Sequence, residues 1–338
     1  MAGTSYSGVE LLRILQRHPE AVVTTVTGRR SAGKGLNEVF PHLAPLDLTI
    51  TEELADSVDV VFSALPRGAG AEKVAPLLEN GTRVVDIGTD FRLKDPEEYR
   101  SWYGADHPCP QYLEKAVYGL TELNRREVAS AQLVSNPGCY PTAAILALAP
   151  AVEAGIIEPD IVIDAKSGVS GAGQKVASEY MFSEVNESLR AYALDGHYHL
   201  PEMTQELGRL ATASVSITFV PHLVPMTRGI LATCYAPLRE SEVGSGDAAR
   251  ARVREVYDGS YKDEPFVRVT DSPPATKQTL GNNVCVVYPT VDVRTNRLIV
   301  VSCIDNLVKG AAGQAVQNMN LMFGLPEDQG LKDLALYP

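Results

Sequence analysis

The chain has 338 residues, of which 45% are hydrophobic and 21% charged, which is the composition of a globular protein large enough for two domains. Its formal net charge of -12 disfavours binding to the phosphate backbone of nucleic acids. The longest apolar run, residues 143–152, is too short to cross a bilayer, and the first residues do not predict a secretory signal. The five cysteines are odd in number and widely spaced, which favours reduced thiols in a cytoplasmic protein.

The first third of the chain alternates between helical and extended patterns. Apolar residues at helical spacing predict helices at 9–18 and 71–78, and β-branched or continuous apolar runs predict strands at 21–26, 58–64 and 83–87. Helices that alternate with buried strands indicate a parallel sheet with right-handed crossovers.

The pattern changes after a predicted helix at 140–152. Five apolar runs joined by loops predict a mixed or antiparallel sheet, with strands at 161–166, 214–219, 229–236, 285–293 and 297–304. A last helix is expected over 311–323, and Gly324 is a plausible C-terminal stop.

The N-terminal residues resemble the glycine-rich turn of a dinucleotide-binding fold. Residues 3–8 read GTSYSG directly before a helix, but too few residues precede them for a strand, and a serine replaces the middle glycine. Either this is a frayed terminus with a helix cap, or it binds a cofactor. In the second case the true start lies upstream, the sequence is trimmed, or the first strand is short. The candidate cofactor contacts are Gly3, Ser5, Tyr6, Ser7 and Gly8.

The end of the second predicted strand bears on the choice of cofactor. Arg29, Arg30 and Ser31 stand where an NAD-preferring fold usually places an acid. Guanidinium groups bind phosphate in a planar fork, so these residues suit the 2′-phosphate of NADP(H). A solvated basic loop is the alternative.

Cys139 is the strongest candidate for a nucleophile. Residues 136–142 read NPGCYPT, in which a strand enters a tight turn and a helix leaves it. Unpaired amide groups at a helix N-terminus favour a thiolate, and Pro141 suits the first helical turn. A buried, inert cysteine is the alternative, and it fits Cys234, Cys285 and Cys303 in their apolar strands.

A cluster of histidines offers the proton transfer that such a thiolate needs. Residues 195–202 read DGHYHLPE, with His197, His199 and Glu202 close together. Imidazole titrates near neutral pH, so it both gives and accepts a proton. The same residues could ligate a metal, but no third ligand cluster accompanies them, and we expect no metal site.

Several segments in order resemble N-acetyl-γ-glutamyl-phosphate reductases of arginine biosynthesis. NPGCYPT and GHYHLPE are similar to the active-site motifs of that family. The resemblance extends over most of the chain through DFRL at 90–93, VYGLTEL at 117–123, KSGVSGAG at 166–173 and DNLVKGAAGQA at 305–315.

The resemblance implies an α/β fold of the aspartate-semialdehyde/glyceraldehyde-phosphate dehydrogenase type. Residues 1–138 and 305–338 would form a Rossmann-type NADP-binding domain, and residues 139–304 a catalytic and oligomerisation domain. It further implies Cys139 as nucleophile, His199 as acid/base with His197 as the fallback, Glu202 as an orienting residue, and a homodimer or homotetramer. Ser63, Leu65 and Pro66 would add cofactor contacts.

The reaction implied is reduction of N-acetyl-γ-glutamyl phosphate to the semialdehyde by NADPH through a Cys139 thioester. The anionic substrate predicts cationic partners, for which Arg92 and Arg228 are candidates beside Asn136. Gly168, Gly171 and Gly173 allow close backbone approach to the cofactor, and Asn306 could contact its nicotinamide amide. For each arginine a structural ion pair is the alternative, and for the glycines a structural turn.

Two other functions fit the same residues. A relative within the family could reduce an aminoadipyl or glutamyl phosphate bound to a carrier protein in lysine or ornithine synthesis. In a different class, the protein could be an NADP-binding regulator without catalysis.

Overall fold

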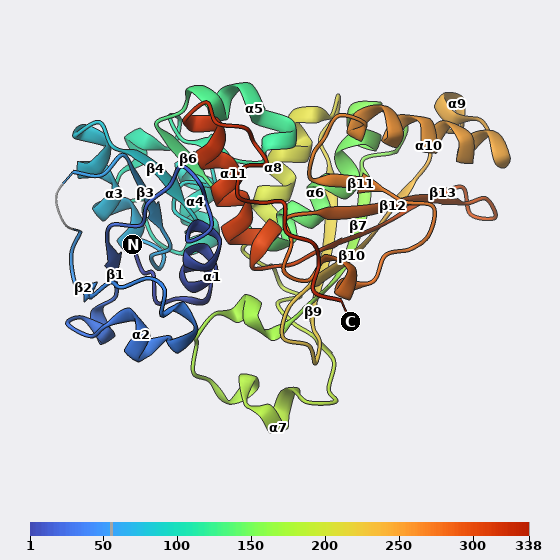
Figure 1. Ribbon diagram of the computed structural model, residues 1–338. Coiled ribbons are helices and arrows are strands. Elements are labelled where there is room, and N and C mark those ends of the chain that lie inside the picture. The colour runs from blue at the N-terminus through green and yellow to red at the C-terminus, as the bar shows by residue number, and fades with distance from the viewer. Residues whose placement is uncertain (55–56, 338) are drawn as a thin grey trace. The chain divides into compact units, whose positions relative to one another are not determined.

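The computed structural model describes residues 1–54 and 57–337, which divide into two compact units (Figure 1). The first comprises Met1–Gly138 and Ala311–Asp333, and the second Cys139–Gly310 and Leu334–Pro338. The division after Gly138 coincides with the expected one. Residues 305–310 and those from Leu334 on were expected in the first unit but belong to the second. The buried Asp305 carboxylate there accepts a hydrogen bond from Gly281 N at 2.7 Å, and Leu336 N donates to Leu280 O at 2.8 Å. None of the helices in the described part of the chain is both long and apolar enough to span a membrane.

The first unit is an α/β structure in which every strand pair is parallel. Its sheet is divided into β1-β2 and β3-β4-β6-β5, whose strands are β1 (Val26–Thr27), β2 (Ile50–Thr51), β3 (Val60–Ser63), β4 (Arg83–Asp86), β5 (Val117–Tyr118) and β6 (Leu133–Ser135). The helices are α1 (Tyr6–Leu15), α2 (Leu36–Val39), α3 (Ala69–Glu79), α4 (Pro96–Tyr103), α5 (Thr121–Ser130) and α11 (Gly313–Met322). The predicted parallel sheet with helical crossovers is confirmed.

Two predictions for this unit were wrong in their bounds. The helix expected over 9–18 starts at Tyr6, because Ser5 is its N-cap and accepts a hydrogen bond from Gly8 N at 3.1 Å. The strand expected over 21–26 is reduced to Val26–Thr27, because only these two residues pair with a neighbour, β2. Residues 21–25 form no ladder.

The C-terminal helix α11 completes the core of the first unit. It packs against α1 and α5. Its buried polar side chains hold loops of the same unit: Asn318 Nδ2 donates to Gly119 O at 2.9 Å, and Asn320 Oδ1 lies 2.9 Å from His18 Nε2. A π-helical turn, Val308–Ala312, precedes α11, and Gly324 ends it at a φ of 67°.

The second unit is built on a mixed sheet, as the sequence predicts, but the described residues form seven strands where five were expected, because the short strands β8 and β11 were not predicted. Its order is β11-β12-β13-β10-β7-β9-β8, with β11·β12 and β7·β9 parallel and the other pairs antiparallel. The strands are β7 (Asp160–Ser167), β8 (Arg190–Ala191), β9 (Ser216–Leu223), β10 (Ile230–Pro237), β11 (Val267–Val269), β12 (Cys285–Asp292) and β13 (Arg297–Ile304). The helices are α6 (Cys139–Glu153), α7 (Phe182–Val185), α8 (Leu200–Leu210), α9 (Glu240–Val243) and α10 (Asp247–Tyr261).

Helix α6 is the centre of this unit and packs against the sheet, α8 and α10. It tolerates Pro150 in its interior because a side chain replaces the lost backbone bond. Pro150 has no N–H to donate to Leu146 O, and the Tyr261 hydroxyl donates to that carbonyl at 2.5 Å. The Tyr257 hydroxyl donates to Ala147 O at 2.6 Å in the same way. The helix that starts at Cys139 is therefore held rigidly from its buried side.

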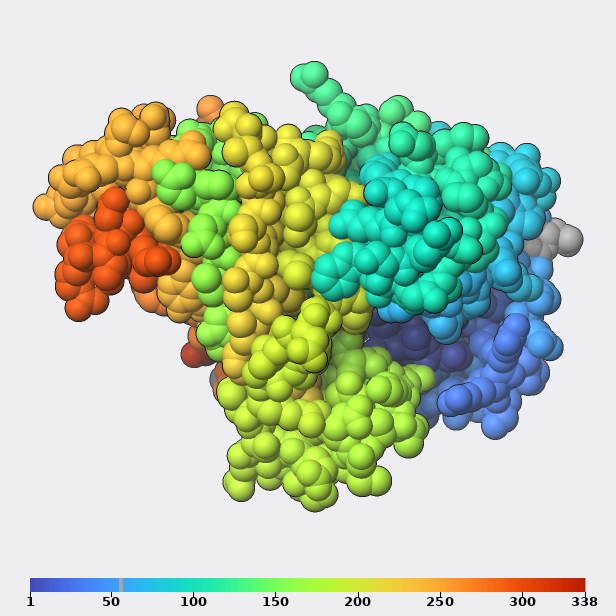
Figure 2. All heavy atoms as spheres, turned by 180° about the vertical axis from the view of Figure 1, so that it is seen from behind, coloured from blue at the N-terminus to red at the C-terminus, as the bar shows by residue number. Residues whose placement is uncertain are grey.

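A long excursion between β7 and α8 contains α7 and β8. Figure 2 shows this segment, coloured yellow-green, standing out from the strands of its own unit. It exposes large apolar side chains: Val176, Met181, Phe182, Leu189 and Leu194. Its inner residues reach the cavity described next.

Candidate active site

Cys139 is the first residue of α6, directly after the turn that follows β6. It is partly exposed, whereas Cys234, Cys285 and Cys303 are buried in strands. Gly310 packs against it so closely that a β-carbon there would lie 2.8 Å from Cys139 Cβ. The helix start and this glycine together fix the position of Cys139 at the N-terminus of α6, which is the end of the helix dipole that favours an anion.

The second unit holds a cavity of about 420 Å³ at this cysteine. Both histidines of the predicted pair reach it, together with aromatic and charged side chains of the excursion. It is lined by Cys139, Tyr140, Ser167, Gly168, Gly171, Ala172, Glu179, Tyr180, Arg190, Tyr192, His197, Tyr198, His199 and Leu223. A nucleophile and two imidazoles thus line one cavity.

The two histidines have different surroundings. His197 Nδ1 accepts the backbone N–H of His199 at 3.1 Å, so this nitrogen carries no proton. Burial lowers the pKa of His197 to about 4, which keeps its ring neutral near pH 7. Its ring stacks on Tyr198 with centroids 4.4 Å apart. These contacts suit a residue that positions its neighbours.

His199 stands at the N-cap of α8 and faces a carboxylate in the first turn of the same helix. Its Nε2 lies 3.9 Å from Glu202 Oε1, and the Glu202 side chain is fully buried. A buried carboxylate at this distance stabilises the protonated imidazole. The pair therefore favours His199 over His197 as the group that cycles a proton.

Sequence reasoning missed a group of residues in the same cavity. The Tyr192 hydroxyl lies 3.2 Å from that of Tyr140, which in turn donates to His222 O at 3.2 Å. Burial raises the pKa of both tyrosines, so they act as neutral hydroxyls. Arg190 brings a positive charge to the cavity and donates to Glu179 O at 3.2 Å. A short run of arginine and tyrosine just before the histidines was the available signal.

The remaining residues of the second unit that were predicted to contact cofactor or substrate divide between the cavity and structural roles within the unit. Gly168 and Gly171 line the cavity, whereas Gly173 supports a turn at a φ of 66°. The Asn306 amide is used internally: its Oδ1 accepts from Gly229 N at 2.7 Å, and its Nδ2 donates to Ser170 Oγ at 2.9 Å. Arg228 forms an ion pair with buried Asp305 at 3.5 Å.

The first unit has the close approaches of a dinucleotide-binding turn. A β-carbon on Gly3 would lie 2.6 Å from Val26 Cγ1, and one on Gly8 would lie 2.6 Å from Gly3 Cα. A β-carbon on Gly28 would lie 2.7 Å from Thr4 Cγ2, so the loop after β1 touches the turn. In a turn this tight, glycines let the helix N-terminus approach a pyrophosphate.

The remaining cofactor candidates surround this turn. Arg29 and Arg30 are exposed in a single 3-10 turn, Arg29–Ser31, beside Gly28. Ser63 ends β3, and Leu65 and Pro66 follow it in the loop before α3. The arrangement fits a dinucleotide whose 2′-phosphate lies near the arginines.

Arg92 and Asn136 have partners inside the first unit. Arg92 Nη2 donates to Ile87 O at 2.9 Å, and Asn136 Nδ2 donates to Ala311 O at 3.1 Å. Asn136 Oδ1 also accepts from Asn318 at 3.0 Å, which ties the end of β6 to α11. Both side chains are buried and stabilise the fold. Among the described residues, no group of three or more His, Cys, Asp or Glu side chains is placed to hold a metal ion.

Comparison with known proteins gives one family. Residues 2–131 match the model "Semialdehyde dehydrogenase, NAD binding domain" and residues 139–306 match "Semialdehyde dehydrogenase, dimerisation domain". N-acetyl-gamma-glutamyl-phosphate reductase of Dehalococcoides mccartyi is 54% identical over 336 residues, covering 99% of this chain and 97% of the relative. The enzyme of the same name from Pelotomaculum thermopropionicum is 50% identical over 346 residues, covering 100% and 98%.

Solved structures agree in fold. Aspartate semialdehyde dehydrogenase II from Vibrio cholerae, complexed with ASA, superposes with a TM-score of 0.70 at 19% identity and covers 95% of this chain and 96% of that one. The Candida albicans enzyme with NADP gives a TM-score of 0.66 at 16% identity, covering 96% and 97%. The chain therefore belongs to the N-acetyl-gamma-glutamyl-phosphate reductase family of semialdehyde dehydrogenases.

Proposed function

We propose that the protein reduces N-acetyl-γ-glutamyl phosphate to N-acetylglutamate semialdehyde with NADPH and releases phosphate, as a step of arginine biosynthesis. The main structural support is the cavity in which Cys139, at the start of α6, faces His197 and His199. The names of the relatives at about half identity fit the same reaction. No described residue favours a carrier-bound substrate or a non-catalytic role.

The chemistry assigned to the chain begins with its sulfur. Cys139 attacks the γ-carbonyl, the C–O bond to phosphate breaks, and a thioester remains on the enzyme. In this proposal, backbone N–H groups at the start of α6 stabilise the oxyanion of this step. Arg190, not Arg92 or Arg228, supplies positive charge at the cavity for the anionic substrate.

His199 and Glu202 serve the second half of the reaction. The thioester carbonyl is reduced by a hydride, which NADPH would supply when it is bound at the turn of residues 3–8. His199, with its charge balanced by Glu202, gives a proton to the oxygen that develops there. The same imidazole takes the proton back as the resulting thiohemiacetal collapses to the aldehyde and Cys139 leaves as a thiolate. His197 holds the backbone of His199 in place.

The working protein is proposed to be a cytoplasmic homo-oligomer, a dimer or a tetramer. The match of residues 139–306 to a dimerisation domain supports this assembly.

The reaction is tested most directly in reverse. With N-acetylglutamate semialdehyde and NADP⁺, we expect NADPH to form when inorganic phosphate is present and not when it is omitted. Aspartate semialdehyde is the matched control, and it should be oxidised far more slowly. Equal rates with the two aldehydes, or turnover independent of phosphate, would contradict the proposal.

Cofactor preference provides a separate prediction for the loop after β1. Replacing both Arg29 and Arg30 with alanine should raise KM for NADP⁺ by about 10²-fold while leaving KM for NAD⁺ nearly unchanged, because two charge-assisted contacts to the 2′-phosphate are lost. The exposed pair Arg250 and Arg252 on α10 is a control of equal charge. An equal rise in KM for NADP⁺ and for NAD⁺ would show that the loop after β1 does not recognise the 2′-phosphate.

A further inference from the structure

A row of polar side chains crosses the parallel sheet of the first unit where three of its strands end. Ser63 of β3, Asp86 of β4 and Ser135 of β6 are direct neighbours across the strands, so their side chains lie on the same face of the sheet. Their exposed fractions are 0%, 1% and 0%. An unpaired charge at such a depth is costly, so the carboxyl group in the middle of the row needs a cation, strong donors or a proton of its own.

The atoms around the Asp86 carboxyl group include other oxygens. A β-carbon on Gly88 would lie 3.1 Å from Asp86 Oδ1 and 3.1 Å from Leu65 O, so the carboxyl group and this carbonyl share one small space. A β-carbon on Gly70 would lie 3.8 Å from Asp86 Oδ1 and 2.9 Å from Asp90 Oδ2, so a second carboxyl group is close as well. The negative end of a carbonyl dipole and a carboxylate both favour the neutral form of Asp86.

Asp90 is the member of this pair that has donors around it. Its carboxylate accepts hydrogen bonds from Gly68 N at 2.8 Å, from Ala71 N at 2.9 Å and from the Tyr99 hydroxyl at 3.3 Å. Three donors at the start of a helix suit a charged carboxylate. Asp90 thereby ties the loop of residues 64–68 and the first turn of α3 to the segment that follows β4.

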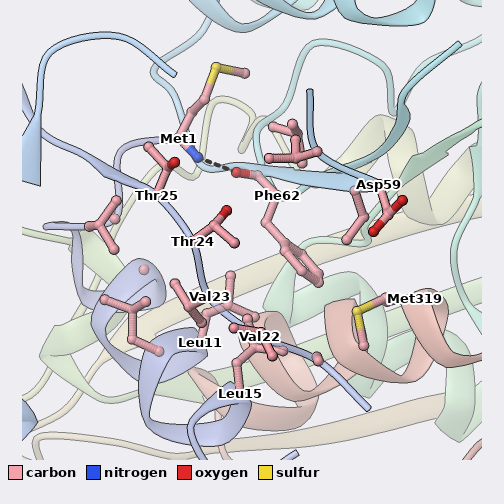
Figure 3. A pocket seen from close by; sticks show the side chains of 18 of the residues that line it. Met1, Leu11, Leu15, Val22, Val23, Thr24, Thr25, Asp59, Phe62 and Met319 are labelled. Atoms are coloured by element: carbon pink, nitrogen blue, oxygen red, sulfur yellow. Dashed lines mark hydrogen bonds between the residues drawn. The ribbon is translucent and has the colours of Figure 1, made fainter. Parts of the chain in front are cut away.

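Two cationic groups act on Asp86. The charge of Arg92 favours the ionised carboxyl group, although its Nη2 also donates to Ile87 O at 2.9 Å. The amino group of Met1, which donates to Phe62 O in Figure 3, interacts with the Asp86 charge as well. Burial lowers the pKa of this amine to about 6, so it carries little charge above about pH 7 and no longer balances the carboxylate there.

The balance of these groups sets the protonation state of Asp86. Burial, followed by the charge of Asp90, raises the pKa of Asp86 to about 7. A hydrogen bond from Ser63 and the charge of Arg92 act in the opposite direction. Tyr99 faces the same carboxyl groups from α4 and remains a neutral hydroxyl, because burial and then Asp90 raise its pKa. Asp86 therefore exchanges its proton with water near neutral pH.

We propose that Asp86 is a positioning residue, which holds the loop of residues 64–68 in its cofactor-binding conformation only while it carries a proton. This role rests on the proposed contacts of NADP(H) with Leu65 and Pro66. When the proton passes to solvent, the Asp86 charge faces Leu65 O and the Asp90 carboxylate, and displacement of the loop toward solvent relieves the repulsion. The cofactor, itself an anion, then binds less tightly.

The first test is the pH dependence of cofactor binding, measured without turnover through the fluorescence of NADPH. In the unaltered protein Kd should rise by at least about tenfold from about pH 6.5 to about pH 9, because the protonated, binding-competent form becomes scarce. Asp86→Asn keeps a neutral side chain of the same shape, so its Kd should be nearly constant. Asp263→Asn removes the same charge at an exposed position of the second unit and should keep the full pH dependence.

Thermal unfolding gives a second readout with a defined sign. Between about pH 4 and pH 7 the Asp86 carboxyl group is neutral in the folded protein and ionised in the unfolded chain, so its burial costs more stability as the pH rises through that window. Asp86→Asn should therefore raise the unfolding midpoint by at least about 3 °C at about pH 8, and by much less at about pH 5. Asp263→Asn should change neither midpoint.

Three outcomes would overturn the role of Asp86. They are a flat Kd profile in the unaltered protein, an equal rise of Kd in Asp86→Asn, and the absence of NADPH binding at any pH. The last would contradict the proposed function as well, whereas tight binding without pH dependence contradicts only the role of Asp86. Should Asp86→Asn fail to fold, hydrogen exchange of the unaltered protein decides. The protection factors of the Gly68 and Ala71 amides should fall as the pH rises, and constant values would refute the proposal.

Discussion

Cys139→Ser should lower kcat by at least about 10⁴-fold and leave the unfolding transition almost unchanged. A serine hydroxyl at the start of α6 keeps the shape of the site, but it is not ionised near neutral pH and it forms an ester that is reduced less readily than a thioester. Rapid-quench mass spectrometry with acyl phosphate and no NADPH should show the mass of an acyl group on the unaltered protein and none on the variant. Turnover near that of the unaltered protein would refute the covalent route.

Cys109→Ser is the matched control for that experiment. Cys109 is also partly exposed, but burial, followed by the nearby carboxylates of Glu72, Glu79 and Asp90, raises its pKa. It should therefore react slowly with iodoacetamide, and its replacement should leave kcat unchanged. Cys139 should be alkylated first, and the substrate should protect it. Preferential labelling of Cys109 would show that the helix terminus does not activate Cys139.

His199→Gln should lower kcat by about 10²- to 10⁴-fold with a small effect on KM, because general acid–base catalysis acts in the transition state. The variant should still accumulate the acyl-enzyme, and the limb of its pH–rate profile that reports imidazole ionisation should disappear. Glu202→Gln should lower kcat less than His199→Gln does, because it removes the carboxylate beside the imidazole but keeps the imidazole itself.

A substitution at His197 tests whether this residue is the acid/base or a residue that positions His199. His197→Asn retains an acceptor for the backbone N–H of His199, and the ring it removes is already neutral near pH 7, so kcat should fall by less than about tenfold with the pH profile unchanged. A larger loss at 197 than at 199, accompanied by a lost pH limb, would reverse the assignment.

The parts of the site that could be predicted were those set by local sequence. The turn before Cys139 and the proline two residues after it define a helix start, and the helix is found there within one residue. The histidine pair lies in a short segment just before α8, so its members reach the cavity together.

Contacts between distant segments could not be predicted from local sequence. Arg190 belongs to a two-residue strand that exists because it pairs with Leu223, thirty-three positions away, so its place in the cavity depends on a contact between distant segments. Asn306 has the residue type expected for a cofactor contact, yet Gly229 and Ser170 occupy its amide. The run at 21–25 has a high strand propensity but no partner with which to pair.

The contact between Gly310 and Cys139 has a consequence for synthesis of the protein. A nascent chain on the ribosome contains its thiol long before residue 310 leaves the exit tunnel, so until then the contact of Gly310 with Cys139 is missing. Reactivity toward acyl phosphates should therefore arise at the end of translation, which would spare unfinished polypeptides from premature acylation.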